Sequence, residues 1–194
     1  MLYLNQLLYR HITYEHNIDR GGASPDHRNV ATSGCGLCCA CMAVEHLTAQ
    51  TLSLEDCVQL SYASGANRKI GTRMEHLGPA LAERFGLCYR ATDRLDELLS
   101  HLQNGGEAAI NVGGDHDDHI GLFSNVGHYV LAVAYDGESV CILDPAYEPG
   151  RYEKEGRRGK VRVSEPFAYC SPEDLKLDTL NRENPFHLFV RKKP

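Results

Sequence analysis

Long apolar runs are absent from this sequence. The longest, from Gly36 to Val44, is far shorter than the roughly 20 consecutive apolar residues that a membrane-spanning helix needs. The N-terminal residues up to His16 lack the basic start, the long apolar stretch and the small-residue cleavage site of a secretory signal peptide. We therefore expect no membrane span and no signal peptide, and predict a cytoplasmic protein.

An excess of positive charge is absent too. The 20 Lys and Arg residues are outnumbered by 26 Asp and Glu residues, which gives a net charge of −6 at pH 7. A chain of this charge offers no broad basic surface to a nucleic acid backbone, so no nucleic-acid partner is expected. Its 194 residues, 42% of them hydrophobic and 24% charged, contain no repeat and no low-complexity segment. The sequence therefore predicts one globular domain over residues 1–194.

Disulfides are not expected, although the chain has eight cysteines. Four of them crowd into one expected helix, where bridges between such close neighbours have poor geometry. Reduced thiols in a cytosol fit this spacing better. Three of the four are expected to be ordinary core residues, since free cysteine is among the most buried residue types; these are Cys38, Cys39 and Cys41.

Hydrophobic periodicity divides the chain into a helical first half and a strand-rich second half. Helices are expected at 36–48, 53–63, 73–85 and 93–103, with a strand or one helical turn at 4–9, a loop at 15–34 and a strand at 87–91. Further strands are expected at 108–112, 128–135, 139–144, 167–170 and 186–191, with a helical turn at 171–173 and a loop or hairpin at 151–162. Asp136-Gly137 is typical of a hairpin turn. Helices followed by antiparallel strands predict an α+β domain.

Cys35 stands where a polar, glycine-flanked turn meets the apolar helix of 36–48. At a helix N-terminus, unpaired N–H groups and the positive end of the helix dipole favour a thiolate over a thiol. Gly34 and Gly36 keep bulky side chains away from the sulfur, so a substrate carbonyl would have access to it. The alternative is a core helix that happens to contain four cysteines.

His128 and Asp144 lie at nearly equal distances from the turn at Asp136-Gly137, one before it and one after it. In an antiparallel hairpin, such residues are near neighbours across the two strands. Each residue alone is typical of a strand end, but their paired register predicts a side-chain hydrogen bond. A cysteine nucleophile needs a base, and the base needs an orienting partner, so these three residues together predict an active site.

Three motifs resemble those of the papain-like cysteine peptidases related to the bacteriocin-leader-processing (C39) peptidases. They are Ser33-Gly34-Cys35-Gly36, Gly127-His128-Tyr129-Val130 and Ile142-Leu143-Asp144-Pro145, within a resemblance that spans roughly 29–146. The resemblance implies a papain-like fold, a helical half against a twisted antiparallel sheet, with Cys35 as nucleophile, His128 as general base and Asp144 as its orienting residue. It implies a peptide or protein substrate and no cofactor. Gly34, Gly36 and Gly127 become candidates for lining the substrate cleft.

One position departs from that family. Its members usually carry a glutamine six residues before the cysteine, where the amide helps to stabilise the oxyanion, and this sequence has Asn29 there. Asparagine carries the same amide donor on a shorter side chain. Asn29 is therefore the predicted oxyanion donor, and it is also the one hint of a catalytically weakened, peptide-binding module. An amidase or transpeptidase would use the same three residues with a different acceptor.

A metal centre is the competing chemistry. Cys35, Cys38 and Cys41 have the spacing of thiolate ligands, and 115–119 is a run of Asp and His residues. On a regular helix, however, positions three apart drift by about 60° per step, so the three thiols do not converge on one ion. No metal is therefore predicted. The 115–119 run is expected to be a solvated loop, placed where it is able to line the cleft beside His128.

Overall fold

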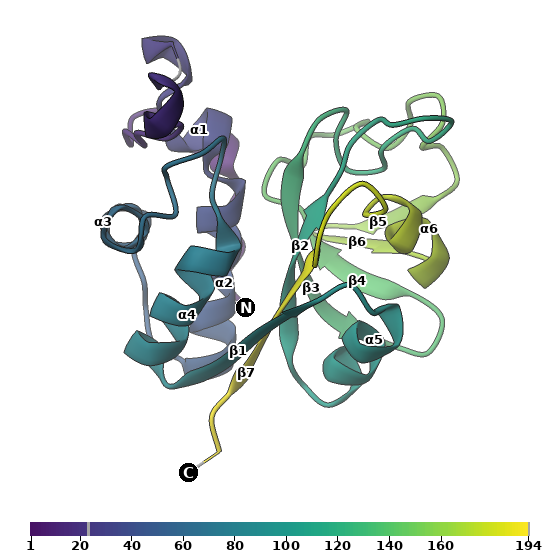
Figure 1. The fold of residues 1–194 in the computed structure, drawn as a ribbon. Helices are drawn as coiled ribbons and strands as arrows, with labels where there is room; N and C mark the ends of the chain where they lie inside the picture. The colour runs from purple at the N-terminus through teal and green to yellow at the C-terminus, as the bar shows by residue number, and fades with distance from the viewer. Residues whose placement is uncertain (23, 194) are drawn as a thin grey trace.

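A computed structural model describes residues 1–22 and 24–193. Ala23, in the loop expected at 15–34, and Pro194 lie outside the described residues. The helices up to residue 85 lie on one side and a twisted antiparallel sheet, with two further helices on its far face, lies on the other (Figure 1). The predicted α+β class is confirmed.

The helical half contains α1 (Val30–Ser33), α2 (Cys35–Thr48), α3 (Leu54–Ser64) and α4 (Met74–Phe85). Capping sets the bounds of α3: the side chain of Ser53 accepts a hydrogen bond from the N–H of Asp56, and Gly65 ends the helix in the left-handed conformation. The periodicity placed α2, α3 and α4 correctly. The short helix α1 was not predicted, because the sequence there has the composition of a loop. Helix α2 is buried from Gly36 to Val44, as its uniformly small and apolar residues predicted.

The sheet has the strand order β1-β7-β2-β3-β4-β6-β5, with every neighbouring pair antiparallel. Its strands are β1 (Leu87–Thr92), β2 (Glu107–Val112), β3 (His128–Tyr135), β4 (Val140–Leu143), β5 (Val161–Ser164), β6 (Phe167–Cys170) and β7 (Phe186–Arg191). Strand β5 was not predicted. It pairs with β6 as an edge hairpin and follows the turns expected in the basic segment.

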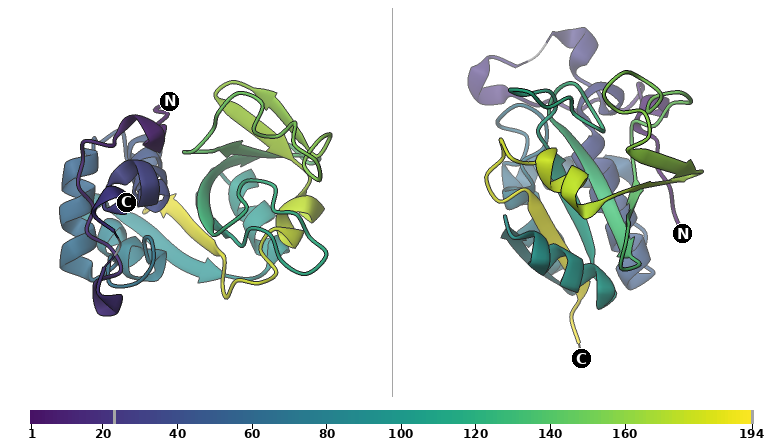
Figure 2. Two further views of the ribbon diagram at one scale, coloured as in Figure 1. Left: turned by 90° about the horizontal axis from the view of Figure 1, so that it is seen from above. Right: turned by 90° about the vertical axis from the view of Figure 1, so that its right-hand side faces the viewer.

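Two apolar clusters form the core, one on each face of the sheet. The first lies between the helices and the sheet, and includes Leu37 and Met42 of α2 with Leu131 of β3. The second lies on the other face of the sheet, under α5 (Leu95–Gln103) and α6 (Pro172–Leu177), and includes Leu98 and Ile110 (Figure 2). The sheet is therefore covered on both faces, and α2 is the central helix of the first cluster.

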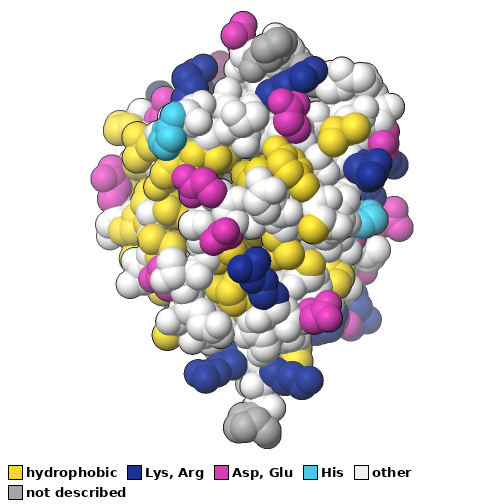
Figure 3. All heavy atoms as spheres, turned by 90° about the vertical axis from the view of Figure 1, so that its left-hand side faces the viewer, with side chains coloured by type: hydrophobic (Ala, Val, Ile, Leu, Met, Phe, Trp, Pro, Cys, Tyr) yellow, Lys and Arg dark blue, Asp and Glu magenta, His cyan; other side chains and the backbone are white. Residues whose placement is uncertain are grey.

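Short 3₁₀ turns precede α1: η1 (Gln6–Leu8), η2 (Ile18–Arg20) and η3 (Pro25–His27). The segment expected at 4–9 thus forms a helical turn. The outer face of the helical half exposes apolar side chains, with charged side chains among them and around them (Figure 3). Within the described part of the chain, each helix is too short or too polar to cross a membrane.

Candidate active site

Cys35 is the first residue of α2 and is half-buried, whereas Cys38, Cys39 and Cys41 are fully buried. Burial raises the pKa of the Cys35 thiol. The charge of His128, a hydrogen bond with His128 and the N–H groups of Tyr129 and Gly36 outweigh burial, so the pKa lies below its usual value. Burial raises the pKa of Cys38 and Cys39 well above that value, and a hydrogen bond with Cys57 together with burial raises the pKa of Cys41. Cys35 is thus chemically distinct within its own helix.

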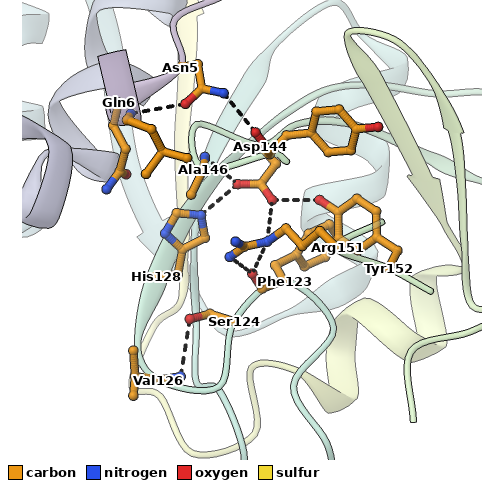
Figure 4. A network of polar contacts seen from close by, with 12 residues as sticks. Asn5, Gln6, Phe123, Ser124, Val126, His128, Asp144, Ala146, Arg151 and Tyr152 are labelled. Carbon is orange, nitrogen blue, oxygen red and sulfur yellow. Dashed lines mark hydrogen bonds and ion pairs between the residues drawn. The ribbon is translucent and has the colours of Figure 1, made fainter. Parts of the chain in front are cut away.

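His128 opens β3, and Asp144 directly follows β4. Both are buried, and Nε2 of His128 donates to Oδ1 of Asp144 over 2.8 Å (Figure 4). The predicted contact between the two residues is confirmed. Because Nε2 faces Asp144, the Nδ1 edge of the imidazole is left for the hydrogen bond with Cys35.

The turn that sets this contact differs from the prediction. Tyr135 pairs with Val140, so the hairpin loop spans four residues instead of the two of Asp136-Gly137. The Asp136 carboxylate accepts the N–H groups of Glu138 and Ser139, which stabilises the longer loop. The register also shifts by one residue at a bulge between Ala132 and Ala134. With both effects, Asp144 lies diagonal to His128 on the same face of the sheet instead of directly opposite.

Four donors converge on the Asp144 carboxylate, which is 1% exposed. Besides His128, Oδ1 accepts the N–H of Ala146 at 2.8 Å. Oδ2 accepts the hydroxyl of Tyr152 at 2.6 Å and lies 3.3 Å from Nε of Arg151 (Figure 4). Burial raises the pKa of Asp144, but the charges of His128 and Arg151 and the hydrogen bonds outweigh it, and the pKa lies below the usual value. Asp144 is therefore held as a carboxylate.

The same contacts act on His128. Burial lowers its pKa, while the charges and hydrogen bonds of Asp144 and Cys35 raise it, to about 9. A thiol with a lowered pKa beside an imidazole with a raised pKa favours the thiolate–imidazolium pair at neutral pH. The arrangement therefore supplies a nucleophile and a proton donor in contact with each other.

Tyr152 and Arg151 were missed by the sequence prediction. They belong to a segment rich in basic residues and glycine, which was expected to be a solvated loop or hairpin. Yet Tyr152 is 2% exposed, and Arg151 bonds to the Phe123 carbonyl as well as Asp144. No local pattern distinguishes these two side chains from their exposed neighbours Glu153 and Lys154.

Asn29 is buried and directly precedes α1 as its N-cap residue. Its Oδ1 accepts the N–H of Thr32 at 3.2 Å, which caps the helix, and its Nδ2 donates to the Asp26 carbonyl at 3.1 Å. The carboxamide is thus engaged on both sides within its own loop. One N–H of Nδ2 is left for a further acceptor, since the group carries two donors. Its action as oxyanion donor stays a prediction.

The three glycines predicted to line the cleft are closely packed. A Cβ on Gly34 would lie 2.5 Å from Cγ1 of Val30, and one on Gly36 would lie 2.8 Å from Cβ of Thr72. A Cβ on Gly127 would lie 2.5 Å from Nη2 of Arg182. Packing therefore explains why Gly34 and Gly36 lack a side chain, whereas the Arg182 group near Gly127 is the end of a flexible side chain that is able to move. Only Gly127 is exposed, next to His128, and contact of the three with a substrate stays a prediction.

The 115–119 run folds back on itself before β3. His116 and His119 form a short antiparallel bridge, and Nε2 of His119 donates to Oδ1 of Asp178 over 2.8 Å. Asp115 accepts the N–H of Gly121. Among the described residues, no group of three or more His, Cys, Asp or Glu side chains is placed to hold a metal ion. The loop is thus anchored to the segment after α6 through His119.

Comparison with known proteins gives matches among solved structures. The peptidase domain of Streptococcus ComA, a bifunctional ABC transporter of a quorum-sensing pathway, matches with a TM-score of 0.52 and 15% identity, over 82% of this chain and 93% of that one. A candidate C39-like peptidase from Bacillus anthracis matches with a TM-score of 0.56 and 13% identity, over 83% of this chain and 90% of that one. This chain has the C39 peptidase fold.

The C39 fold agrees with the resemblance carried by the three motifs, and the predicted papain-like architecture is confirmed. Neither the protein-family models nor the curated proteins give a match to the sequence. At this level of identity the likeness establishes the fold. What the chain does must be argued from its own side chains.

Proposed function

We propose that the protein is a cysteine peptidase that cleaves a peptide bond through an acyl-enzyme, with Cys35, His128 and Asp144 as its catalytic residues. One observation carries the proposal: a half-buried cysteine at a helix N-terminus is hydrogen-bonded to an imidazole whose other nitrogen donates to a buried carboxylate. A nucleophile, a base in contact with it and a group that orients the base are the parts that acyl transfer requires.

In the first half-reaction, the Cys35 thiolate attacks the carbonyl carbon of the peptide bond, and the carbonyl oxygen becomes an oxyanion. The N–H groups at the start of α2 and the predicted donor Asn29 stabilise this charge. The His128 imidazolium then gives its proton to the departing amine, the C–N bond breaks, and a thioester to Cys35 is left. Asp144 keeps the imidazole oriented and stabilises its positive charge.

In the second half-reaction, neutral His128 takes a proton from water as the water oxygen attacks the thioester carbon. Collapse of the tetrahedral intermediate releases the carboxylic acid and returns the thiolate beside the imidazolium. Replacement of water by an amine would give transfer instead of hydrolysis, with the same residues in the same positions. The chemistry on the protein side needs no cofactor.

Thiol alkylation tests this proposal without a known substrate. Iodoacetamide at pH 7, followed by peptide mapping, should label Cys35 faster than Cys88, the exposed thiol in the edge strand β1. His128→Ala should remove the preference, because the imidazolium stabilises the thiolate. Peptide cleavage in a mixed peptide library, present in the wild type and absent in Cys35→Ser, would complete the test. Equal labelling of Cys35 and Cys88 would contradict the proposal.

A further inference from the structure

Residues 2–6, which end at the first residue of η1, contact both the helical half and the sheet half at the candidate active site. We call this segment the N-terminal strap. In Figure 4, Asn5 and Gln6 lie beside His128 and Asp144, which are more than a hundred residues away in the sequence. Its contacts fall into two groups, one to each half of the molecule.

The first group joins the strap to the segment that carries Asp144. The Tyr3 hydroxyl donates to the backbone carbonyl of Asp144 at 2.8 Å. The N–H of Gln6 donates to the Pro145 carbonyl at 2.7 Å, and Nδ2 of Asn5 donates to the Tyr147 carbonyl at 2.8 Å. Three of the strap's residues thus hold the turn directly after β4.

The second group joins the strap to the helices. Nε2 of Gln6 donates to the carbonyl of Ala31 in α1 at 2.8 Å, in the turn of chain that leads to Cys35. Further along α2, the N–H of Leu4 contacts Sδ of Met42 at 3.4 Å, and Nε2 of His46 donates to the Leu2 carbonyl at 2.8 Å. The strap is therefore fixed to the helical half at α1 and along the second half of α2.

Gln6 belongs to both groups. Its backbone is bonded to the residue after Asp144, and its side chain is bonded to a residue four positions before Cys35. The side chain is buried, and its Oε1 has no hydrogen-bond partner among the described residues. An unpaired buried carbonyl costs stability, so the position is not optimised for packing alone.

We propose that the N-terminal strap is a positioning device for the Cys35–His128 pair, with Tyr3 and Gln6 as its positioning residues. The inference rests on the proposed peptidase function. Helix α2 already packs against β2, β3 and β7, which joins the two halves away from the site. The strap adds hydrogen bonds at the site itself, which connect α1 with the turn that follows Asp144. Nucleophile and base must lie within hydrogen-bond distance, and small displacements cost large factors in rate.

The test compares strap variants with a control from the same turn. Gln6→Leu removes the side-chain bond to Ala31, and Tyr3→Phe removes only the hydroxyl that holds Asp144. Leu8→Ala changes an exposed side chain at the end of η1 and serves as the control. The readout is the rate of Cys35 alkylation by iodoacetamide from pH 5 to pH 10, with Cys88 as the internal reference.

A displaced imidazole no longer stabilises the thiolate. We therefore expect Gln6→Leu and Tyr3→Phe to lower the Cys35 rate at pH 6 by about tenfold, with little change at pH 10, where the thiol ionises without help. The apparent pKa of the reaction should rise in both variants and stay unchanged in Leu8→Ala. General loss of stability would not produce this shift. Tyr3→Phe keeps the ring and its packing, so the test does not depend on Gln6→Leu folding normally.

Two results would count against the inference, and they are distinguishable. If wild-type Cys35 is labelled preferentially but both strap variants keep the wild-type pH profile, the strap has no positioning role and the peptidase proposal stands. If wild-type Cys35 shows no preference over Cys88, the proposed function fails and the positioning role fails with it.

Discussion

The Tyr152 hydroxyl donates to Oδ2 of Asp144 over 2.6 Å, on the carboxylate oxygen that His128 does not contact. Arg151 contacts the same oxygen, while Ala146 shares the other one with His128. These contacts therefore hold the carboxylate in one orientation and also keep it ionised. An imidazole bonded to a fixed carboxylate keeps one orientation, which is what a general base beside Cys35 requires.

Tyr152→Phe should weaken both stability and turnover. The variant leaves a buried acceptor with one donor fewer, which typically costs about 1–3 kcal/mol in the free energy of unfolding. Chemical denaturation measures that loss. Because Asp144 would hold His128 less firmly, we expect peptidase turnover to fall by about tenfold. Tyr147→Phe is the matched control, since the Tyr147 hydroxyl bonds to the exposed Glu165 and not to Asp144. Equal effects of the two variants would contradict the assignment.

The pH dependence should show the ion pair. The pKa of His128 is raised to about 9, so its positive charge is present below that pH and is lost as the pH rises through it. Against the effect of burial, the charge and hydrogen bond of His128 lower the pKa of Cys35, so the thiolate forms below that point. Peptidase kcat/KM should therefore rise as Cys35 ionises, stay high through neutral pH and fall near pH 9 as the imidazolium loses the proton that the leaving amine needs.

The alkaline limb of that profile should depend on Asp144, whereas the acidic limb reflects ionisation of the Cys35 thiol. In Asp144→Asn the imidazolium loses its carboxylate partner, so the pKa of His128 should fall and the alkaline limb should move to lower pH. A profile of kcat/KM against pH for both proteins makes the comparison. An alkaline limb that does not move in Asp144→Asn would show that Asp144 does not set the pKa of His128.

Two substitutions separate the structural and the catalytic roles of Asn29. Asn29→Asp keeps an oxygen that caps α1 but has no N–H donor, whereas Asn29→Ala removes both groups. Loss of the cap should cost about 1 kcal/mol of stability in the alanine variant only. If Asn29 donates to the oxyanion, both variants should lose about 10²–10³-fold in kcat. Full turnover in Asn29→Ala would remove the residue from the mechanism.

Much of the fold was predictable, because it depends on local patterns. The apolar run of α2, the Ser53 cap of α3 and the glycine after α4 each mark a helix in the sequence itself. The contact between His128 and Asp144 was predictable for the same reason, since a hairpin brings its two strands together locally. The hairpin's four-residue loop was not predicted, because it is stabilised by bonds of the Asp136 carboxylate to the loop backbone, and the bulge between Ala132 and Ala134 left no pattern in the sequence.

Contacts between distant segments left no sequence signal. Tyr152 and Arg151 lie in a stretch whose composition resembles an exposed loop, yet both reach the Asp144 carboxylate. Gln6 lies in a short segment that had two possible structures on its own. Which buried acceptor such a side chain meets depends on how the two halves pack, and that is not encoded in its neighbours.

The two ends of the chain differ in what they tolerate. The strap passes between the halves within a few residues of the start, whereas the last strand β7 leads the chain out at the far end of the sheet (Figure 1). Met1, ahead of the strap, is exposed, so a purification tag or a surface tether added there extends into solvent. Trimming residues 2–6, by contrast, would remove the bonds of Tyr3, Asn5 and Gln6 to the turn after β4, whereas the described residues after Arg191 make no bond to that turn.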